Sequence, residues 1–536
     1  MRARLGSILA AVAFLAPCWA SAEAPGPKVT IDGLFDQVTA AGSNFYDGNY
    51  TRTGDREWYA RLRFRPDFRF EVGRTKAELE LQLDITYGQS GACAAGPAKA
   101  TLPAAGSLCP GEKTGATSSS SLNTDVGEVV KVEWAYTEFD LTGADALLPF
   151  IPVQTVARAG LQPFETVATY RLTYAFGSFP GVSAITRWAP NATTQLAYVV
   201  IEDELGTARH QIPMIPALGH DYAWIVSEES TLFTGFELKP MYSYFHADGT
   251  TSAAARRPAI NRRTVGGNVA GAAAYASATG LHEDRHTLGA SARWRSGPWA
   301  LDPVVLYQTG TRETQAMTRH GVGVAQAGVS AWLVDVVAAR GLGPWLLEVR
   351  TIYSTGNEAR DNLSRGIRYF EPLDTNNSYA AGWGEILSLS AIGDYILGTL
   401  SNAGMSSNVG YDRYGRAQLL TRVTYAISPT LSLSARVNPT WTAEKVDTDT
   451  GVASVSVGHR TIISDRSFVK GDSHYIGTEA DLGLVWRFSP NTEFGLAGGW
   501  LFAGPALDTL EIRNGAPTKA HARDAWVVSS RIRLLF

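Results

Sequence analysis

The residues most suggestive of chemistry are four arginines at odd positions within one short stretch. Arg61, Arg63, Arg65 and Arg69 alternate with apolar residues. A guanidinium group can donate two parallel hydrogen bonds to a carboxylate or a phosphate. If alternate residues share one face, this spacing predicts a surface that attracts anions.

The sequence contains no GxSxG or CxxCH pattern. His282-Glu283-Asp284-Arg285-His286 matches HExxH by letter, but it lies at a predicted loop-to-strand junction rather than on the helix that this zinc motif requires. We therefore expect neither an enzyme nor a cofactor, and covalent haem is excluded. His282 and His286 are interpreted as loop histidines, and Gly321-Val322-Gly323 as a loop. Asp447-Thr448-Asp449 and Asp374-Thr375-Asn376-Asn377 carry oxygen ligands for calcium but match no full calcium loop, so we interpret them as polar turns.

The alternation of polar and apolar residues predicts the elements that position these arginines. From Trp58 to Val72 the even positions are mainly apolar and the odd positions mainly charged, and the pattern resumes over 75 to 88 after a turn at Gly73-Arg74. Successive side chains of a strand point to opposite faces. The two segments therefore predict a hairpin with lipid on one side and water on the other.

Similar segments recur along the chain and predict an all-β fold, a transmembrane antiparallel up-and-down β-barrel of about 18 strands. Four prolines inside them, Pro66, Pro240, Pro303 and Pro439, predict bulges or positions near the membrane interface. The eighteen segments are 29 to 41, 58 to 72, 75 to 88, 129 to 141, 153 to 162, 182 to 188, 192 to 202, 220 to 228, 231 to 246, 285 to 296, 299 to 309, 326 to 338, 344 to 354, 413 to 427, 430 to 442, 475 to 488, 492 to 502 and 524 to 536.

The connections alternate between short turns and long loops, as expected for periplasmic turns and extracellular loops. Both termini then face the periplasm. Five tryptophans beside the short turns predict an aromatic girdle: Trp188, Trp294, Trp299, Trp345 and Trp486. The long loops are 89 to 128, 247 to 284, 355 to 412 and 443 to 474, and we expect 355 to 412 or 89 to 128 to fold into the barrel as a partial plug.

The N-terminus predicts export to the bacterial outer membrane. Residues 1 to 22 have the charged, apolar and small-residue regions of a signal peptide, so the barrel occupies 23 to 536. A lipoprotein acylated at Cys18 is the alternative. Cys93 and Cys109 then remain in an exported chain, and we expect a disulfide between them. No apolar run reaches the roughly 18 residues of a transmembrane helix.

The inward faces of the predicted strands carry eighteen basic and twelve acidic residues, although the mature chain is net acidic. This excess predicts a lumen that attracts anions. Pairing between neighbouring strands is the alternative role for these charges, above all in the 58 to 88 hairpin. The inward residues expected to contact a substrate are Arg61, Arg63, Arg65, Arg69, Arg158, Arg187, Arg293, Arg295, Arg350, Arg422, Arg436, Arg487, Arg531, Arg533, Glu78, Glu80, Asp84, Glu479 and Asp481.

The chain resembles the bacterial alginate-export family. The resemblance rests on Arg61-Leu62-Arg63-Phe64-Arg65 after Ile31-Asp32-Gly33, on Gly160-Leu161-Gln162 after Trp134-Ala135-Tyr136, and on Gly477-Thr478-Glu479-Ala480-Asp481-Leu482. It implies an eighteen-stranded barrel with an arginine-lined lumen that exports an anionic polysaccharide. Leu161 departs from the family pattern, in which an arginine is expected.

These observations predict a passive outer-membrane channel or exporter for an anionic polysaccharide or small anionic solutes. The expected partners are outer-membrane lipids, the transported anion and periplasmic export proteins, with no nucleic acid. The alternative is a structural barrel that forms a sheath around a partner, such as an electron-transfer protein. Current through a planar bilayer distinguishes the two.

Overall fold

The computed structural model describes most of the strands and parts of the loops. The described residues are 26–44, 50–51, 56–87, 125–126, 130–164, 175, 177–202, 221–247, 282–318, 321–358, 361, 366–373, 382–388, 414–446, 448, 471–513 and 516–536. The predicted signal peptide, Cys93 and Cys109 lie outside this range, as do most of the two candidate calcium turns. Among the described residues, no helix is both long and apolar enough to cross a membrane.

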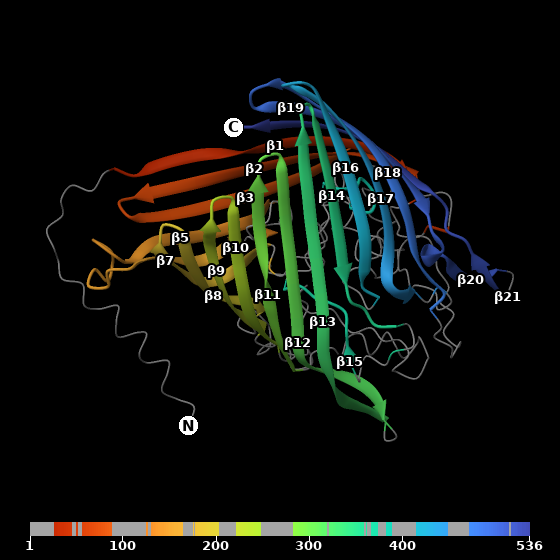
Figure 1. Cartoon of the computed structure of the whole chain (residues 1–536), viewed down its shortest axis with the longest axis horizontal. Coiled ribbons are helices and arrows are strands. Elements are labelled where there is room, and N and C mark those ends of the chain that lie inside the picture. The colour runs from red at the N-terminus through yellow and green to blue at the C-terminus, as the bar shows by residue number, and fades with distance from the viewer. Residues whose placement is uncertain are drawn as a thin grey trace.

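Eighteen antiparallel strands form a closed barrel, because the first strand pairs with both the second and the last (Figure 1). The strands are β1 (Lys28–Ser43), β2 (Arg56–Val72), β3 (Thr75–Tyr87), β5 (Val130–Thr142), β6 (Gln154–Phe164), β7 (Gly177–Ala189), β8 (Ala192–Glu202), β9 (Asp221–Phe233), β10 (Phe236–Ala247), β11 (Glu283–Ser296), β12 (Trp299–Thr318), β13 (Gly321–Leu342), β14 (Trp345–Ser354), β16 (Arg416–Ser428), β17 (Leu431–Val446), β18 (Ser473–Ser489), β19 (Thr492–Ala503) and β22 (Ala525–Leu535). The predicted fold class and strand number are confirmed.

Four short strands accompany the barrel. Asp125–Val126 (β4) pairs with β5, and Gly366–Ile367 (β15) runs parallel to β13. Thr509–Arg513 (β20) and Ala516–Ala520 (β21) form a separate hairpin after a 3-10 turn at Pro505–Leu507. Figure 1 shows this hairpin projecting beyond the barrel wall.

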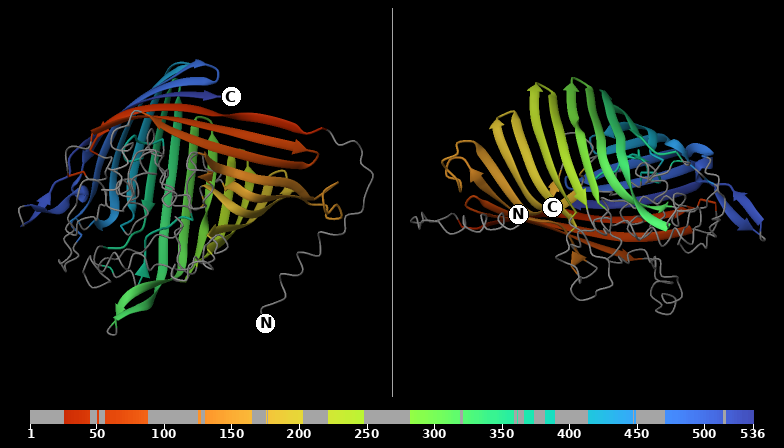
Figure 2. Two further views of the ribbon diagram at one scale, coloured as in Figure 1. Left: turned by 180° about the vertical axis from the view of Figure 1, so that it is seen from behind. Right: turned by 90° about the horizontal axis from the view of Figure 1, so that it is seen from below.

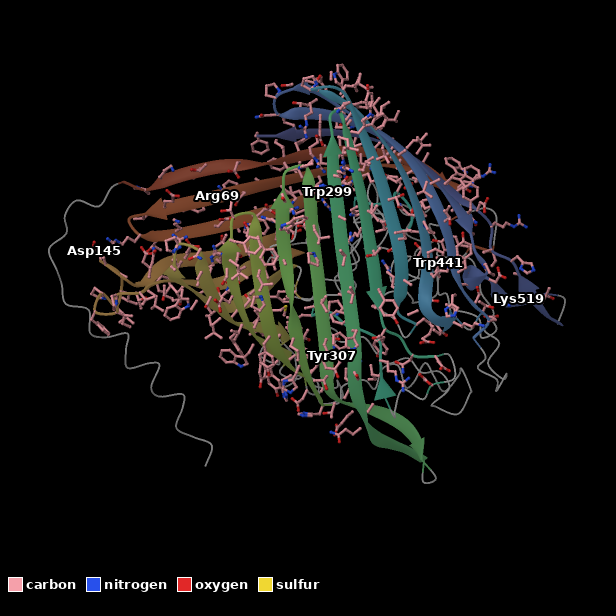
Figure 3. The ribbon with its side chains drawn as sticks, viewed as in Figure 1. Arg69, Asp145, Trp299, Tyr307, Trp441 and Lys519 are labelled. Carbon is pink, nitrogen blue, oxygen red and sulfur yellow. The ribbon has the colours of Figure 1, made fainter. Side chains whose placement is uncertain are left out.

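The two faces of the wall differ as the sequence alternation predicts. In β1, Val29, Ile31 and Phe35 are exposed, whereas Asp36 and Val38 are buried on the opposite face. Apolar side chains cover the outside of the barrel, as Figure 3 shows around Trp299 and Trp441. The predicted tryptophans beside the short turns lie on this outer face, Trp294 being the most covered of them. A closed barrel with an apolar outer face is the form in which strands span an outer membrane.

Two-residue turns join seven strand pairs at one end of the barrel, where the β5–β6 connection (143–153) is longer. The long connections lie at the other end, except that β13 begins there only three residues after β12 ends. Gly73 and Gly343 adopt positive φ angles of 59° and 58° in the two-residue turns, which tight hairpins require and glycine tolerates. Several predicted boundaries were wrong. The β9–β10 turn lies at Thr234-Gly235 rather than at 229 to 230, and β12 and β13 extend far beyond 309 and 326, so that Gly321-Val322-Gly323 begins a strand.

The four strand prolines produce no bulge, so the first of the two predicted alternatives is wrong for them. Pairing of β2 with β3 stops after Phe64↔Leu83 and resumes at Asp67↔Glu80 in the same register, with Pro66 in the gap. The same gap without a shift occurs beside Pro240, Pro303 and Pro439. A proline lacks the N–H that the ladder needs, so each one interrupts pairing with one neighbouring strand only.

Two stretches of the predicted 355 to 412 loop, residues 366–373 and 382–388, lie against the inner face of the barrel, and we call them the inner segments. Phe370, Leu373 and Trp383 are fully buried in a cluster with inward side chains of the wall, including Leu306 and Leu333. β15, which begins the first segment, pairs with Gly328–Val329 at the edge of β13, and the rest of the segment packs inside the curved sheet that Figure 2 shows from two sides. The inner segments therefore occupy part of the barrel interior. Residues 89–124 lie outside the described range.

Candidate functional site

Three arginines converge on one carboxylate where the first and last strands meet. Asp36 of β1 lies 3.4 Å from Arg61 of β2, 3.0 Å from Arg531 and 3.5 Å from Arg533 of β22. The register places Asp36 opposite both Arg63 and Arg533. This meeting of basic residues results from barrel closure, because β22 and β2 flank β1.

The cluster continues along the wall to Glu493 of β19. Arg533 lies 3.9 Å from Glu493, and Arg487 of β18 lies 3.7 Å from the same carboxylate. We call Arg61, Arg487, Arg531 and Arg533 the arginine strip. With Asp36 and Glu493, these described side chains hold four positive and two negative formal charges.

The arginine strip is partly open to solvent. The side chains of Arg531 and Arg533 are 28% and 31% exposed, whereas those of Arg61 and Asp36 are only 3% and 2% exposed. Because Arg531 and Arg533 lie on the inward side of β22, their exposure is toward the barrel interior. The strip therefore combines a buried ion pair with reachable cationic groups.

The hairpin arginines behave differently, because acids of the neighbouring strands pair with them. Arg65 contacts Glu80, and Arg69 lies within 4 Å of Asp32, Asp67 and Glu78 (Figure 3). These contacts support the alternative role of the hairpin charges, which is pairing between neighbouring strands. Arg63 is buried and paired in register with Asp84, whose side chain lies outside the described residues.

Most other predicted arginines also have an acidic neighbour on the wall. Arg187 lies near the β7–β8 turn, where it is paired in register with Thr193 rather than with an acid. The closest nitrogen-to-oxygen distances are 2.7 Å for Arg158–Glu138, 3.3 Å for Arg293–Glu237, 2.6 Å for Arg295–Asp302 and 2.9 Å for Arg350–Asp335. These pairs cancel much of the predicted positive excess.

Glu371 anchors the first inner segment in a buried charge network, which we call the Glu371 anchor. Its carboxylate accepts hydrogen bonds from Arg285 of β11 and Arg312 of β12, and both arginines also contact Glu283. The four side chains are at most 4% exposed. Two arginines and two carboxylates make this anchor formally neutral.

Tyr369 completes the Glu371 anchor. Its hydroxyl lies 3.1 Å from Nη1 of Arg312, which donates to it. Burial raises the pKa of Tyr369 to about 12, so the hydroxyl stays neutral. A neutral hydroxyl extends the network without changing its charge.

The second inner segment is held by contacts around Trp383. Arg422 lies over the Trp383 ring at 4.7 Å from its centroid while donating to Glu348. Glu385 pairs with Arg436 at 2.7 Å. The carboxylate of Glu479 accepts the backbone N–H groups of Ile386 and Leu387, and Asp481 lies on the same strand, within 3.5 Å of Asn438. Four predicted substrate residues, Arg422, Arg436, Glu479 and Asp481, thus lie around a chain segment.

Sequence reasoning missed the residues that organise these networks. Asp36 and Arg285 lie at inward positions of segments that the sequence predicted, so the alternation would have found them. Arg312 lies in the unpredicted extension of β12. Glu371 and Glu385 belong to a loop, where no periodic signal indicates the direction of a side chain.

Comparisons with known proteins give a limited likeness. No family model matches the chain, and no curated protein matches it. Solved structures of outer-membrane channels are similar over nearly the whole length. OccK8 (OprE) of Pseudomonas aeruginosa has 10% identity, covers 95% of this chain and 98% of its own, and has a TM-score of 0.45.

Two further structures have similar values. A BenF-like porin from Pseudomonas fluorescens Pf-5 has 11% identity, coverage of 95% and 98%, and a TM-score of 0.44. OccD3 (OpdP) of Pseudomonas aeruginosa has 11% identity, coverage of 96% and 93%, and a TM-score of 0.43. Sequence identities and TM-scores this low do not assign a function to the chain.

Proposed function

We propose that the protein is a passive outer-membrane channel that favours anions. The observation that carries the proposal is the arginine strip, in which four arginines share two carboxylates on the inner face. A passage lined by low-dielectric walls and an excess of one charge raises the local concentration of the opposite charge. The exposed Arg531 and Arg533 side chains supply that excess where a solute can reach it.

The inner segments limit the size of the solute that can pass through the barrel. They are held by buried contacts on β11, β12 and β16 to β18, and Ile386 and Leu387 also pack among inward side chains of β1, β19 and β22, so they narrow the interior. The arginine strip lies on β2, β18 and β22, and Arg487, Arg531 and Arg533 lie toward the short-turn end of their strands. We therefore favour a small carboxylate- or phosphate-bearing solute that passes along the strip, because a guanidinium can pair with either group through two hydrogen bonds.

An anionic polysaccharide is the second candidate. The resemblance to alginate exporters and the length of the strip along the wall favour it. An extended polyanion would need the inner segments to move, whereas a small anion would not. The two candidates therefore differ in whether locking the inner segments stops transport.

Planar-bilayer recording of the purified chain tests the proposal. We expect single-channel currents whose reversal potential in a KCl gradient indicates anion preference, and block by polyglutamate but not by polylysine. Crosslinking a cysteine in segment 382–388 to one on β17 should leave small-ion current intact. A barrel that inserts but carries no current would contradict the proposal and favour the sheath.

A further inference from the structure

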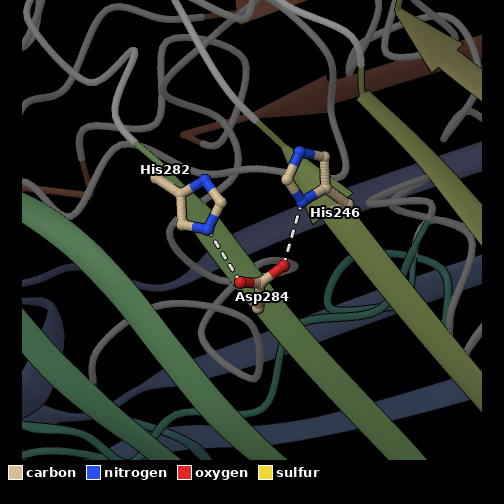
Figure 4. Close-up of side chains that lie close together, drawn as sticks. All are labelled: His246, His282 and Asp284. Atoms are coloured by element: carbon tan, nitrogen blue, oxygen red, sulfur yellow. Dashed lines mark hydrogen bonds and ion pairs between the residues drawn. The ribbon is translucent and has the colours of Figure 1, made fainter. Parts of the chain in front are cut away.

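Two histidines and an aspartate lie together at the ends of two neighbouring strands, away from the arginine strip (Figure 4). His246 is near the end of β10, and His282 and Asp284 flank the start of β11. The ligand-type atoms of the three side chains all lie within 4.8 Å of one another. The site stands on the long-loop end, where the 247 to 284 connection leaves and rejoins the barrel.

The cluster lies on the outer face of the wall. Phe245 and Ala247 are buried on the inward side of β10, and the exposed Tyr242 shares the other side with His246. The three side chains are between 18% and 43% exposed. An ion could therefore reach them from solvent without passing through the barrel.

Asp284 connects the two imidazoles. One carboxylate oxygen lies 2.9 Å from Nδ1 of His246, and the other lies 2.7 Å from Nε2 of His282. The His246 and His282 rings are 4.9 Å apart and nearly perpendicular. Both imidazoles thus direct a ring nitrogen toward the same carboxylate from opposite strands.

The surrounding side chains fix this arrangement. The Tyr244 hydroxyl donates a 2.5 Å hydrogen bond to Asp284, and the Tyr222 ring packs on His246 at 5.1 Å. Carboxylates that bind metals are commonly oriented by such outer hydrogen bonds. His286, the other member of the sequence pair, instead lies 2.8 Å from the Tyr242 hydroxyl.

We propose that His246, His282 and Asp284 bind a divalent transition metal ion, Zn²⁺ above all. Two imidazole nitrogens and one carboxylate oxygen are a donor set that zinc uses, with water in the fourth position. Nitrogen donors disfavour Ca²⁺ and Mg²⁺, which prefer oxygen ligands. A bare hydrogen-bonded triad is the alternative, and it needs no ion.

Metal binding would reinforce the base of a long loop. His246 and His282 flank the 247 to 281 stretch, where β10 and β11 already pair through Ala247 and Glu283. An ion that binds the folded chain and not the unfolded chain raises the free energy of unfolding. The proposed ion would therefore stabilise the rim of β10 and β11, independently of what the channel transports.

Cobalt titration of the detergent-folded full chain, prepared without a histidine tag, tests the site. Co²⁺ replaces Zn²⁺ in such sites and absorbs visible light when bound in a tetrahedral site. We expect one Co²⁺ per chain, displaced by Zn²⁺, and a rise in thermal stability with either ion. Absence of saturable binding by the wild-type chain would overturn the proposal.

Four variants locate the bound ion. Asp284→Asn and His282→Ala should abolish the cobalt spectrum. Tyr244→Phe should weaken cobalt binding about tenfold or more, because it removes the hydroxyl that donates a hydrogen bond to Asp284. His474→Ala, a histidine of β18 outside the cluster, is the matched control and should bind normally. Unchanged binding in folded Asp284→Asn and His282→Ala, or equal loss in His474→Ala, would show that the ion binds elsewhere and contradict the assignment.

Discussion

The arginine strip and the Glu371 anchor are built from the same two kinds of side chain, yet they differ in balance and in burial. The anchor contains two arginines and two carboxylates, all almost fully buried. The strip contains four arginines and two carboxylates, and Arg531 and Arg533 are partly exposed. One network has neutralised its charge, and the other retains an excess.

This difference separates a structural role from a transport role. Removing one partner from a buried ion network leaves an uncompensated charge, which costs about 3–5 kcal/mol. Balanced buried charge can therefore hold a loop segment against the wall. Excess charge that solvent reaches has lost less of its hydration, so it remains available to a passing anion.

The largest expected effect follows from breaking the Glu371 anchor. Glu371→Ala removes one of the two carboxylates that Arg285 and Arg312 share, so docking of segment 366–373 should weaken by about 3–5 kcal/mol. We expect faster hydrogen exchange in that segment and a higher single-channel conductance. Glu228→Ala, which removes an exposed acid near the β9–β10 turn, is the control. Unchanged exchange in segment 366–373 would show that charge pairing does not hold it.

A smaller effect on docking is expected from substitution of Asn438, which is fully buried in β17. Its side-chain amide donates to the Trp383 carbonyl oxygen and accepts the Thr421 backbone N–H. Asn438→Ala should cost about 1–3 kcal/mol of docking because buried polar groups lose their partners. Hydrogen exchange should rise in 382–388 but not in 366–373. A rise in both would mean that the two inner segments dock as one unit.

The smallest effect is expected where charge is balanced but exposed. Asp472 lies 2.8 Å from Lys519 of β21 (Figure 3 labels Lys519). Burial tends to raise the pKa of Asp472, but hydrogen bonds from Lys519 and Thr448 outweigh it and hold the pKa below its ordinary value. Such a contact is fully present above the ordinary aspartate pKa of about 3.9 and is lost as the pH falls through the lower, folded value.

Lys519→Ala tests this third case. An exposed ion pair contributes about 0–1 kcal/mol, so hydrogen exchange of the β20–β21 hairpin should rise only slightly at neutral pH. In strong acid, where Asp472 is protonated, variant and wild type should exchange alike. A large difference that persists in acid would show that Lys519 acts through packing rather than through its charge.

The sequence predicts the wall of the barrel well because the signal is local. Polar and apolar residues must alternate along each strand. The alternation around Arg61 or Val528 can therefore be recognised without knowing which strands lie beside it. Short turns such as Gly73-Arg74 then define the order of the strands. All eighteen predicted segments correspond to barrel strands, and the errors lie at their ends.

The inner networks could not be predicted in the same way because their partners are distant in sequence. Glu371 meets Arg285 and Arg312 only after its loop folds back into the barrel. His246 and Asp284 are paired in register across β10 and β11, but a long loop separates them in the chain. Sequence spacing drew attention only to His282 and His286, which were interpreted as loop histidines. That interpretation is wrong for His286, which lies within β11, and strand pairing instead brings His246 to Asp284.

The reversal potential in a KCl gradient tests the central claim most directly, measured for the wild type, for Arg531→Gln with Arg533→Gln, and for Arg340→Gln. Arg340 is the control because it lies over Trp299 on the outer face. A charge within about a Debye length of the passage changes an ion's free energy by roughly 1 kcal/mol. We predict that the wild type prefers chloride, that the double variant loses about fivefold or more of that preference, and that the control loses none. Equal selectivity in all three would contradict the account.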